Sequence, residues 1–213
     1  FRLARMYPEW VNTLSDPLQW RPGFVASPKD ERLKAAGAKM RVVTESNWEH
    51  ALAFFASKVA ETPFFTIDTE TTTPDASDDW QAINNEKVDV LASTLTSFQI
   101  SFGANCQYAY LVSIDHLDSD NITDYQTKLK QLISLIPKEK LTVAHNAAGF
   151  ELPVLYKECN LGDNGWRGMF PNMVDTRIAA SYWDENQFSH GLKQLSKLLF
   201  DYDQITYDEV TGG

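Results

Sequence analysis

Short runs of β-branched and aromatic residues along the chain predict a series of strands. The central one is residues 64–71, in which four strand-favouring residues run into Asp68 and Glu70. Because alternate side chains of a strand share one face, both carboxylates should point the same way where the strand ends. Further strands are predicted at residues 40–43, 95–102, 108–114 and 141–144. Residues 103–105 are typical of a hairpin turn.

Apolar residues at helical spacing predict helices between these strands. The first helix should begin near Ser46, because Ser46 and Glu49 have the spacing of a capping box. Its apolar face, better explained by core packing than by chemistry, consists of Trp48, Leu52, Phe55 and Val59. Further helices are predicted at residues 123–136, 174–182 and 191–200. Their buried stripes would be Leu129, Leu132, Ile133 and Ile136 in the first, and Leu192, Leu195, Leu198 and Leu199 in the last.

One more helix is predicted after residues 141–144, and it carries residues 150–156. Pro153 is tolerated only in the first turn of a helix, so Glu151 should lie close to the helix start. Residues 74–90 are acidic and polar and are expected to form a long surface loop. Residues 160–172 are rich in Gly and Asn and are expected to form another loop.

The composition indicates one domain plus an extension. The chain has 213 residues, 43% of them hydrophobic, with 12 Phe, 8 Tyr and 6 Trp. Residues 1–40, interrupted by four prolines, are predicted to be the extension, and residues 41–213 the domain. The net charge of −10 argues against an open basic surface for duplex DNA. Bound divalent cations would nevertheless reverse the field within one cleft.

Cysteine use and hydropathy bear on the compartment. Cys106 and Cys159 belong to no Cys-x-x-Cys pair, which favours a reducing compartment over a disulfide framework. No apolar run approaches the length of a membrane span, and the first residues lack the apolar core of a signal peptide. We therefore expect a cytoplasmic protein without a membrane partner.

The paired carboxylates of Asp68 and Glu70 are the strongest candidates for chemistry. Two carboxylates side by side repel each other unless a cation lies between them, and hard oxygen ligands suit Mg²⁺ or Mn²⁺. A divalent-metal site for phosphodiester chemistry is one interpretation. The other is an acidic loop after a buried strand, which is a common arrangement.

Three stretches together carry a resemblance to a known family. They are residues 68–71, residues 143–155, and Asp175-Thr176-Arg177 followed by residues 191–195 and 205–210. They resemble the 3′–5′ proofreading exonuclease domain of family A DNA polymerases, within the wider DEDD exonuclease group. The His-Asn start of the second stretch and its Leu-Pro after the acid look most like phage-type polymerases. The resemblance covers about residues 40–213 and implies an α/β, ribonuclease H-like exonuclease fold, a mixed central β-sheet flanked by α-helices.

The resemblance implies two divalent metal ions, Mg²⁺ or Mn²⁺, held by Asp68, Glu70 and Glu151 as the catalytic acids. Glu70 would also help to orient the attacking water. Glu151 takes the position of the third acid, where the family more often has Asp. The candidate substrate-binding residues are Thr71, His145, Asn146 and Phe150, of which Asn146 matches a contact to the terminal nucleotide and Phe150 the aromatic beside the acid.

Each of these residues also has a purely structural interpretation. Asn146 suits a turn that ends a strand, Phe150 suits core packing, and Glu151 suits a helix N-terminus with free amides. Asp175 is a further acid near the motifs. We interpret it as the N-cap of the helix that follows, rather than as a metal ligand.

The last motif of the family, a Tyr followed after three residues by an Asp, lies beyond residues 205–210, and the sequence stops at Gly213 before reaching it. Three explanations stay open: a portion of a longer polymerase, one piece of a split polymerase, or a domain that has lost catalysis.

The leading hypothesis is a metal-dependent exonuclease that hydrolyses the 3′ end of single-stranded DNA. It would proofread in DNA replication for a family A DNA polymerase, in cis or on a separate chain, in the cytoplasm of a bacterium or a phage-infected cell. The alternatives are an inactive exonuclease fold that acts as a structural or DNA-binding platform for a polymerase, and a stand-alone ribonuclease of the same superfamily.

Overall fold

The computed structural model describes residues 40–72, 90–104, 106–117, 119–159, 168–186 and 189–204. Residues 38–176 form one compact unit, and the described residues from Arg177 onward belong to a second. Apart from Met40 of the predicted extension and Val90 of the loop predicted at 74–90, these two segments lie outside the described residues, as do most of the loop at 160–172 and the segment 205–210. The division into residues 1–40 and 41–213 stays a prediction.

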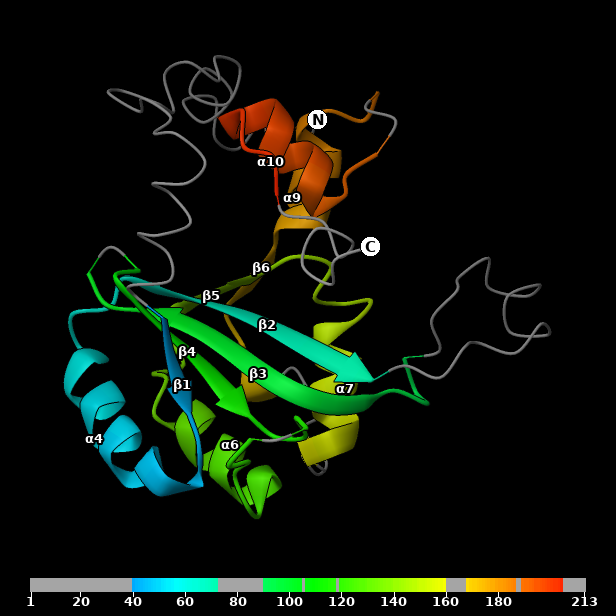
Figure 1. Cartoon of the computed structure of the whole chain (residues 1–213). Coiled ribbons are helices and arrows are strands. Elements are labelled where there is room, and N and C mark those ends of the chain that lie inside the picture. The colour runs from blue at the N-terminus through cyan, green and yellow to red at the C-terminus, as the bar shows by residue number, and fades with distance from the viewer. Residues whose placement is uncertain are drawn as a thin grey trace. The chain divides into compact units, whose positions relative to one another are not determined.

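A six-stranded mixed sheet forms the centre of the first unit (Figure 1). Its strands are β1 (Met40–Val43), β2 (Phe64–Thr72), β3 (Thr94–Phe102), β4 (Tyr108–Ser113), β5 (Leu141–Ala144) and β6 (Met173–Asp175). The order across the sheet is β1-β4-β3-β2-β5-β6. The neighbours β2-β3 and β3-β4 are antiparallel, and the remaining pairs are parallel. The predicted strands and the mixed sheet are confirmed.

The hairpin turn between β3 and β4 requires its glycine. Gly103 has a φ of +91°, in the region that side chains other than glycine's rarely adopt. Its amide donates to the Thr62 hydroxyl at 2.9 Å, and a Cβ at Gly103 would lie 2.8 Å from the Tyr108 ring. The turn predicted from residues 103–105 therefore depends on both the freedom and the small size of glycine.

Helices flank the sheet: α4 (Trp48–Lys58), α6 (Tyr125–Ser134) and α7 (Glu151–Cys159). Phe55 of α4 packs edge-on against Phe102 with ring centroids 4.8 Å apart, and Phe102 packs in the same way against Tyr110. This aromatic cluster joins α4 to β3 and β4, and burial of such rings is a large stabilising term. The predicted apolar stripe of α6 is also confirmed, because Leu129, Leu132, Ile133 and Ile136 are all buried.

The predicted capping box at Ser46 and Glu49 is wrong. A 3₁₀ turn, η1 (Glu45–Asn47), precedes α4, and Thr44 is its N-cap. The Asn47 side chain accepts a hydrogen bond from the Thr44 amide at 3.0 Å. The Ser46 amide donates instead to a carboxylate oxygen of Asp120, a residue distant in sequence, also at 3.0 Å.

Two predictions near the C-terminus are corrected. Val174 and Asp175, assigned to a helix, lie in β6, because β5 supplies backbone partners that the sequence pattern does not show. The helices that follow are α9 (Thr176–Trp183) and α10 (Leu192–Phe200). In α10 only Leu195 of the predicted stripe is well buried, whereas Leu192 and Leu198 are exposed. The buried face of α10 is therefore narrower than its row of leucines.

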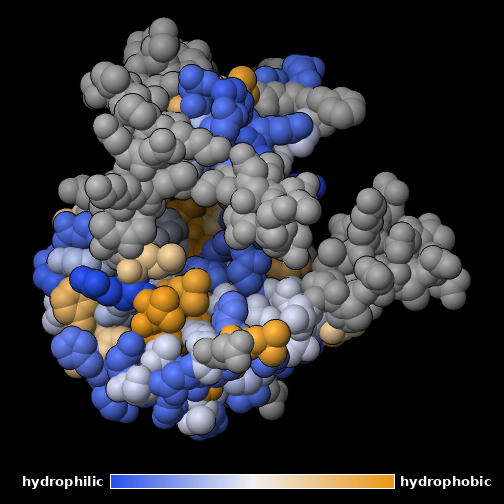
Figure 2. Space-filling view, viewed as in Figure 1, coloured by the Kyte–Doolittle hydropathy of each residue, from blue (hydrophilic) through white to orange (hydrophobic). Residues whose placement is uncertain are grey.

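Apolar side chains also reach the described surface, in separate areas among hydrophilic ones (Figure 2). Met40 and Val42 of the edge strand β1 are about half exposed, at 45% and 50%. None of the described helices has both the length and the apolarity needed to cross a membrane.

Candidate active site

Strand β2 sets Asp68 and Glu70 on one face of the sheet. Both are exposed, while Thr69 between them is only 4% exposed, so the alternation predicted from the sequence is confirmed. The residues opposite them on β3 are Gln99 and Ser97, respectively. Directly opposite residues of an antiparallel pair share a face, and this face of β2 and β3 is therefore polar.

The register of β2 against β3 shifts between Glu70 and Thr71. Such a β-bulge locally increases the twist of a strand and redirects its side chains. Thr71 lies directly after the bulge and is half-buried. The sequence gives no signal of this bulge.

Glu151 begins α7 and is buried, with 5% of its surface exposed. Its carboxyl group lies close to the Asp68 carboxylate, and its own backbone amide at the helix start also interacts with it. Its second oxygen, Oε2, is buried and has no hydrogen-bond partner. A buried carboxylate oxygen without a donor is costly, so this atom is suited to a cation or a proton.

The pKa values of the three acids are raised because the carboxylates lie close together and are partly shielded from water. Burial, followed by the Asp68 and Asp175 carboxylates, raises the pKa of Glu151 to about 7. The protein atoms around Asp68 likewise raise its pKa, although part of its side chain meets solvent, and the nearby His145 opposes this. Glu70 is exposed, but the protein atoms around it partly exclude water and, followed by the Asp68 carboxylate, raise its pKa. The site therefore disfavours three negative charges unless a cation is present.

Parallel pairing explains why His145 lies near Asp68. Strands β2 and β5 pair with Thr66 opposite Val143, so Asp68 and His145 each follow that pair by two residues. The chain leaves β5 at this point, and residues at the carboxyl ends of parallel strands meet at one edge of a sheet. The β5–α7 connection thereby brings His145, Asn146 and Glu151 to the edge where β2 carries its acids.

Asn146 has a left-handed backbone conformation, with φ at +61°. Asn adopts this conformation more readily than most residues. The Asn146 carbonyl accepts hydrogen bonds from the amides of Gly149 and Phe150, at 2.9 and 3.0 Å. A Cβ at Gly149 would lie 2.8 Å from the Asn146 side-chain oxygen. The turn interpretation of Asn146 is thus confirmed, and Gly149 permits the tight return into α7.

Asp175 and Thr176 contact the same connection from the end of β6. Asp175 lies opposite Ala144 in the sheet, and its carboxylate accepts hydrogen bonds from the amides of Asn146 and Ala148 at 2.9 and 3.2 Å. The Thr176 hydroxyl lies 3.0 Å from His145 Nδ1 and 3.2 Å from the Ala144 carbonyl oxygen. Asp175 directly precedes α9. Its interpretation as the N-cap stays a prediction, and no local sequence pattern indicates its contacts with this connection.

The structure thus brings together only part of the predicted set. Asp68 and Glu151 meet, and Glu70 follows two residues along β2. Phe150 is half-buried and packs on the hydrophobic core just before α7, which confirms its structural interpretation. Among the described residues, no group of three or more His, Cys, Asp and Glu lies close enough together to hold a metal ion. The donors nonetheless suit one, since they are carboxylates and one buried oxygen lacks a partner.

Comparisons by sequence give no family, since no protein-family profile and no curated protein matches the chain. Solved structures are similar in fold. The RNase domain of the yeast Pop2 protein has a TM-score of 0.53 at 13% identity, over 83% of this chain and 80% of that one. The Aedes aegypti Nibbler EXO domain has a TM-score of 0.54 at 7% identity, over 81% and 73%.

A chain in the structure of the yeast NOT1 MIF4G domain co-crystallized with CAF1 has a TM-score of 0.56 at 13% identity, over 83% of this chain and 81% of that chain. These structures and the six-stranded mixed sheet confirm the predicted ribonuclease H-like exonuclease fold. The family A polymerase context is tested by none of them and stays a prediction, as do the roles of the site residues.

Proposed function

We propose that this chain is a metal-dependent 3′–5′ exonuclease domain. The observation that carries the proposal is the meeting of Asp68 and Glu151 from separate segments, with a buried Glu151 oxygen that has no hydrogen-bond partner. A carboxylate pair in a partly buried site is unfavourable without a proton or a cation. The likeness in fold to an RNase domain and an EXO domain supports the same reaction class.

Asp68, Glu70 and Glu151 are the residues that would hold two divalent ions, Mg²⁺ or Mn²⁺. When bound, such ions supply activation of a water and stabilisation of the leaving 3′ oxygen. The three carboxylates would supply the negative charge that holds such ions at the edge of the sheet. Glu70, which is exposed on β2, would also help to orient the attacking water.

The residues around the acids would bind the end of the nucleic acid. His145 and Asn146 follow β5 at the edge where Asp68 lies, so they are placed to contact the terminal nucleotide. Phe150 directly precedes Glu151 in sequence and is only partly buried, while Thr71 lies beyond the bulge of β2. The net charge of −10 suits a site that takes only a few nucleotides of single strand and relies on bound metal for positive charge.

The order of the three motifs supports a finer proposal: the substrate is the 3′ end of single-stranded DNA, and the domain proofreads for a family A polymerase in cis or on another chain. RNA is the second candidate substrate, favoured by the fold likeness to the yeast Pop2 RNase domain. Parallel assays on DNA and RNA oligonucleotides of one sequence distinguish the two.

The experiment is hydrolysis of 5′-labelled single-stranded oligonucleotides by the full chain with Mg²⁺ or Mn²⁺. We expect a ladder of products that shortens from the 3′ end, and its loss in the double variant Asp68→Ala, Glu70→Ala. Asp120→Asn, a change of a carboxylate outside the site, is the matched control and should leave the rate unchanged. A double variant that degrades the substrate as fast as the unaltered chain excludes this mechanism.

The second candidate function is an inactive exonuclease fold that serves as a platform for a polymerase. It is favoured by the absence of a three-ligand cluster among the described residues. Calorimetric titration with Mn²⁺ separates the two: binding of two ions that Asp68→Ala weakens favours the exonuclease. A titration without binding heat, together with no hydrolysis, favours the platform.

A further inference from the structure

Asp175 and Thr176 are adjacent residues, and both reach the connection that carries two candidate nucleotide contacts. The two oxygens of Asp175 accept separate backbone amides, those of Asn146 and Ala148. Hydrogen bonds to an ionised acceptor are about twice as strong as neutral ones. Two such bonds to one carboxylate fix the path of the backbone between these amides.

The conformation being held is one that needs support. A left-handed backbone conformation is unfavourable for residues other than glycine, and Asn146 has a φ of +61°. The bond from its amide to Asp175 and the bonds to its carbonyl from Gly149 and Phe150 surround this one residue. Both the amide and the carbonyl group of Asn146 are therefore hydrogen-bonded in this conformation.

The Thr176 hydroxyl determines which nitrogen of His145 carries a proton. A hydroxyl group has one hydrogen to donate and lone pairs to accept. The Ala144 carbonyl can only accept, so the Thr176 hydroxyl donates to it at 3.2 Å. The same oxygen, 3.0 Å from His145 Nδ1, must then accept from an N–H at that position. Both contacts are hydrogen bonds only when Nδ1 is protonated.

We propose that Asp175 and Thr176 form a clamp that positions Asn146 and His145, and that the clamp sets the Nδ1–H tautomer of His145. In that tautomer the neutral ring has its lone pair on Nε2. The functional consequence rests on the proposed exonuclease, because it makes Asp175 and Thr176 positioning residues for nucleotide binding. The clamp itself is a property of the folded chain without metal or substrate.

The chain offers conservative variants and matched controls. Asp175→Asn keeps one acceptor but turns the other into an NH₂ group that faces an amide. Thr176→Val removes the hydroxyl at equal size, whereas Thr176→Ser keeps it. Asp120 and Thr123 make the same kinds of bond in a different network, to the Ser46 amide and to Glu45. Asp120→Asn and Thr123→Val are therefore the controls.

The deciding measurements are made by NMR on the full, isotope-labelled chain without metal. We expect the ring nitrogen shifts of His145 to report the Nδ1–H tautomer in the unaltered chain and in Thr176→Ser, and a change toward Nε2–H in Thr176→Val. We expect Asp175→Asn to accelerate hydrogen exchange at the Asn146 and Ala148 amides by on the order of tenfold. The Asp120 and Thr123 controls should alter neither measurement.

Kinetics give the functional arm. With a single-stranded oligonucleotide and Mg²⁺, Asp175→Asn and Thr176→Val should raise KM more than they lower kcat, and Thr176→Ser should restore KM. An Nε2–H tautomer in the unaltered chain, or unchanged exchange in Asp175→Asn, overturns the clamp. Because those readouts need neither metal nor substrate, a chain with an intact clamp and no hydrolysis would count against the proposed function alone.

Discussion

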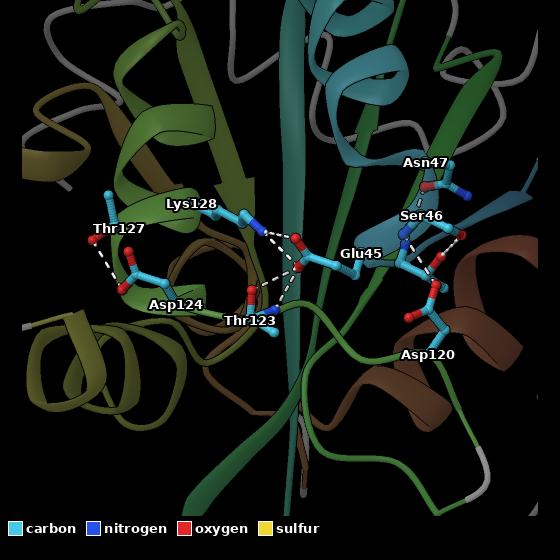
Figure 3. A network of polar contacts seen from close by, with 9 residues as sticks. Glu45, Ser46, Asn47, Asp120, Thr123, Asp124, Thr127 and Lys128 are labelled. Carbon is cyan, nitrogen blue, oxygen red and sulfur yellow. Dashed lines mark hydrogen bonds and ion pairs between the residues drawn. The ribbon is translucent and has the colours of Figure 1, made fainter.

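Two carboxylate sites in the same compact unit have opposite electrostatics. At one, Glu45 accepts hydrogen bonds from the Thr123 amide at 2.7 Å, from the Thr123 hydroxyl at 3.0 Å and from the Lys128 ammonium at 2.6 to 2.7 Å (Figure 3). At the other, Glu151 has a buried oxygen without a partner and a second carboxylate, Asp68, as its neighbour.

The pKa directions record this difference. The Lys128 and Thr123 donors hold the pKa of Glu45 below its ordinary value. Burial and neighbouring carboxylates raise the pKa of Glu151 to about 7. A carboxylate that joins η1 to the start of α6 is supplied with donors by the fold itself. A carboxylate that lacks such donors, like Glu151, is consistent with the proposed metal site, because a bound cation would supply the missing positive charge.

The largest expected effect distinguishes the two sites by activity. Glu151→Gln removes a ligand charge and should lower the rate of 3′-end hydrolysis by on the order of a hundredfold or more. Glu151→Asp, which restores the acid that the resembled family more often has, should retain much of the rate. Glu45→Gln should leave hydrolysis unchanged. The assignment of Glu151 is wrong if Glu151→Gln cleaves as well as Glu45→Gln does.

The next effect is the stabilisation of the chain by metal. A ligand present at about 100 times its Kd stabilises the folded state by about 2.7 kcal/mol. At about 2 to 4 °C per kcal/mol for a chain of this size, Mn²⁺ at pH 8 should raise Tm by roughly 5 to 10 °C. At pH 5 protons compete for Glu151, so the shift should be much smaller. In Asp68→Ala the Tm shift at pH 8 should be largely lost. If Mn²⁺ raised the Tm of this variant as much as that of the unaltered chain, the ions would bind elsewhere.

A smaller effect concerns the pH dependence of stability without metal. The pKa of Glu151 is raised from its ordinary 4.5 to about 7 in the folded chain, so the folded state binds the extra proton between those values. The stabilisation that protonated Glu151 gives to the folded state is therefore fully present below pH 4.5 and is lost as pH rises through 7.

The side chain in Glu151→Gln stays neutral at every pH, so this variant should not lose stability as pH rises through 7. After allowance for screening by water, we expect the variant to gain on the order of 1 to 2 kcal/mol over the unaltered chain at pH 8, relative to pH 5. Urea unfolding with a chelator present, at several pH values, measures it. Parallel pH curves for the two proteins would mean that Glu151 is not the titrating group.

The comparison also shows what the sequence could predict. The alternation in β2 and the Pro153 position were sufficient to place Asp68, Glu70 and Glu151 on a strand face and a helix start, because both are local properties of the chain. The mixed sheet came from the motif resemblance, and the fold comparisons confirm it. These predictions hold because each depends on few neighbours.

Features that depend on distant partners were missed. The Ser46 amide, which the predicted capping box assigned to the start of a helix, bonds Asp120, which lies far along the chain. Strand β6 forms only because β5 is beside it. The bonds of Asp175 to the β5–α7 amides need the parallel register of these two strands. In each case one side chain or strand satisfies backbone groups that no local pattern identifies.

The smallest effect is at the site with ample donors. Because Glu45 has a folded-state pKa below its ordinary 4.5, it stabilises the chain above pH 4.5, and this contribution is lost as pH falls through the folded value. Glu45→Gln should therefore lower the free energy of unfolding at pH 7 and should no longer do so in acid. This change with pH is opposite in sign to that of Glu151→Gln.

Lys128→Met keeps apolar bulk near the Trp48 ring and should remove part of the same pH dependence, since the Lys128 hydrogen bond is the largest cause of the lowered Glu45 pKa. Urea unfolding from pH 3 to pH 7 measures both variants. If Glu45→Gln and Glu151→Gln shifted stability with pH in the same direction, the contrast between a donor-rich and a donor-poor carboxylate would be wrong.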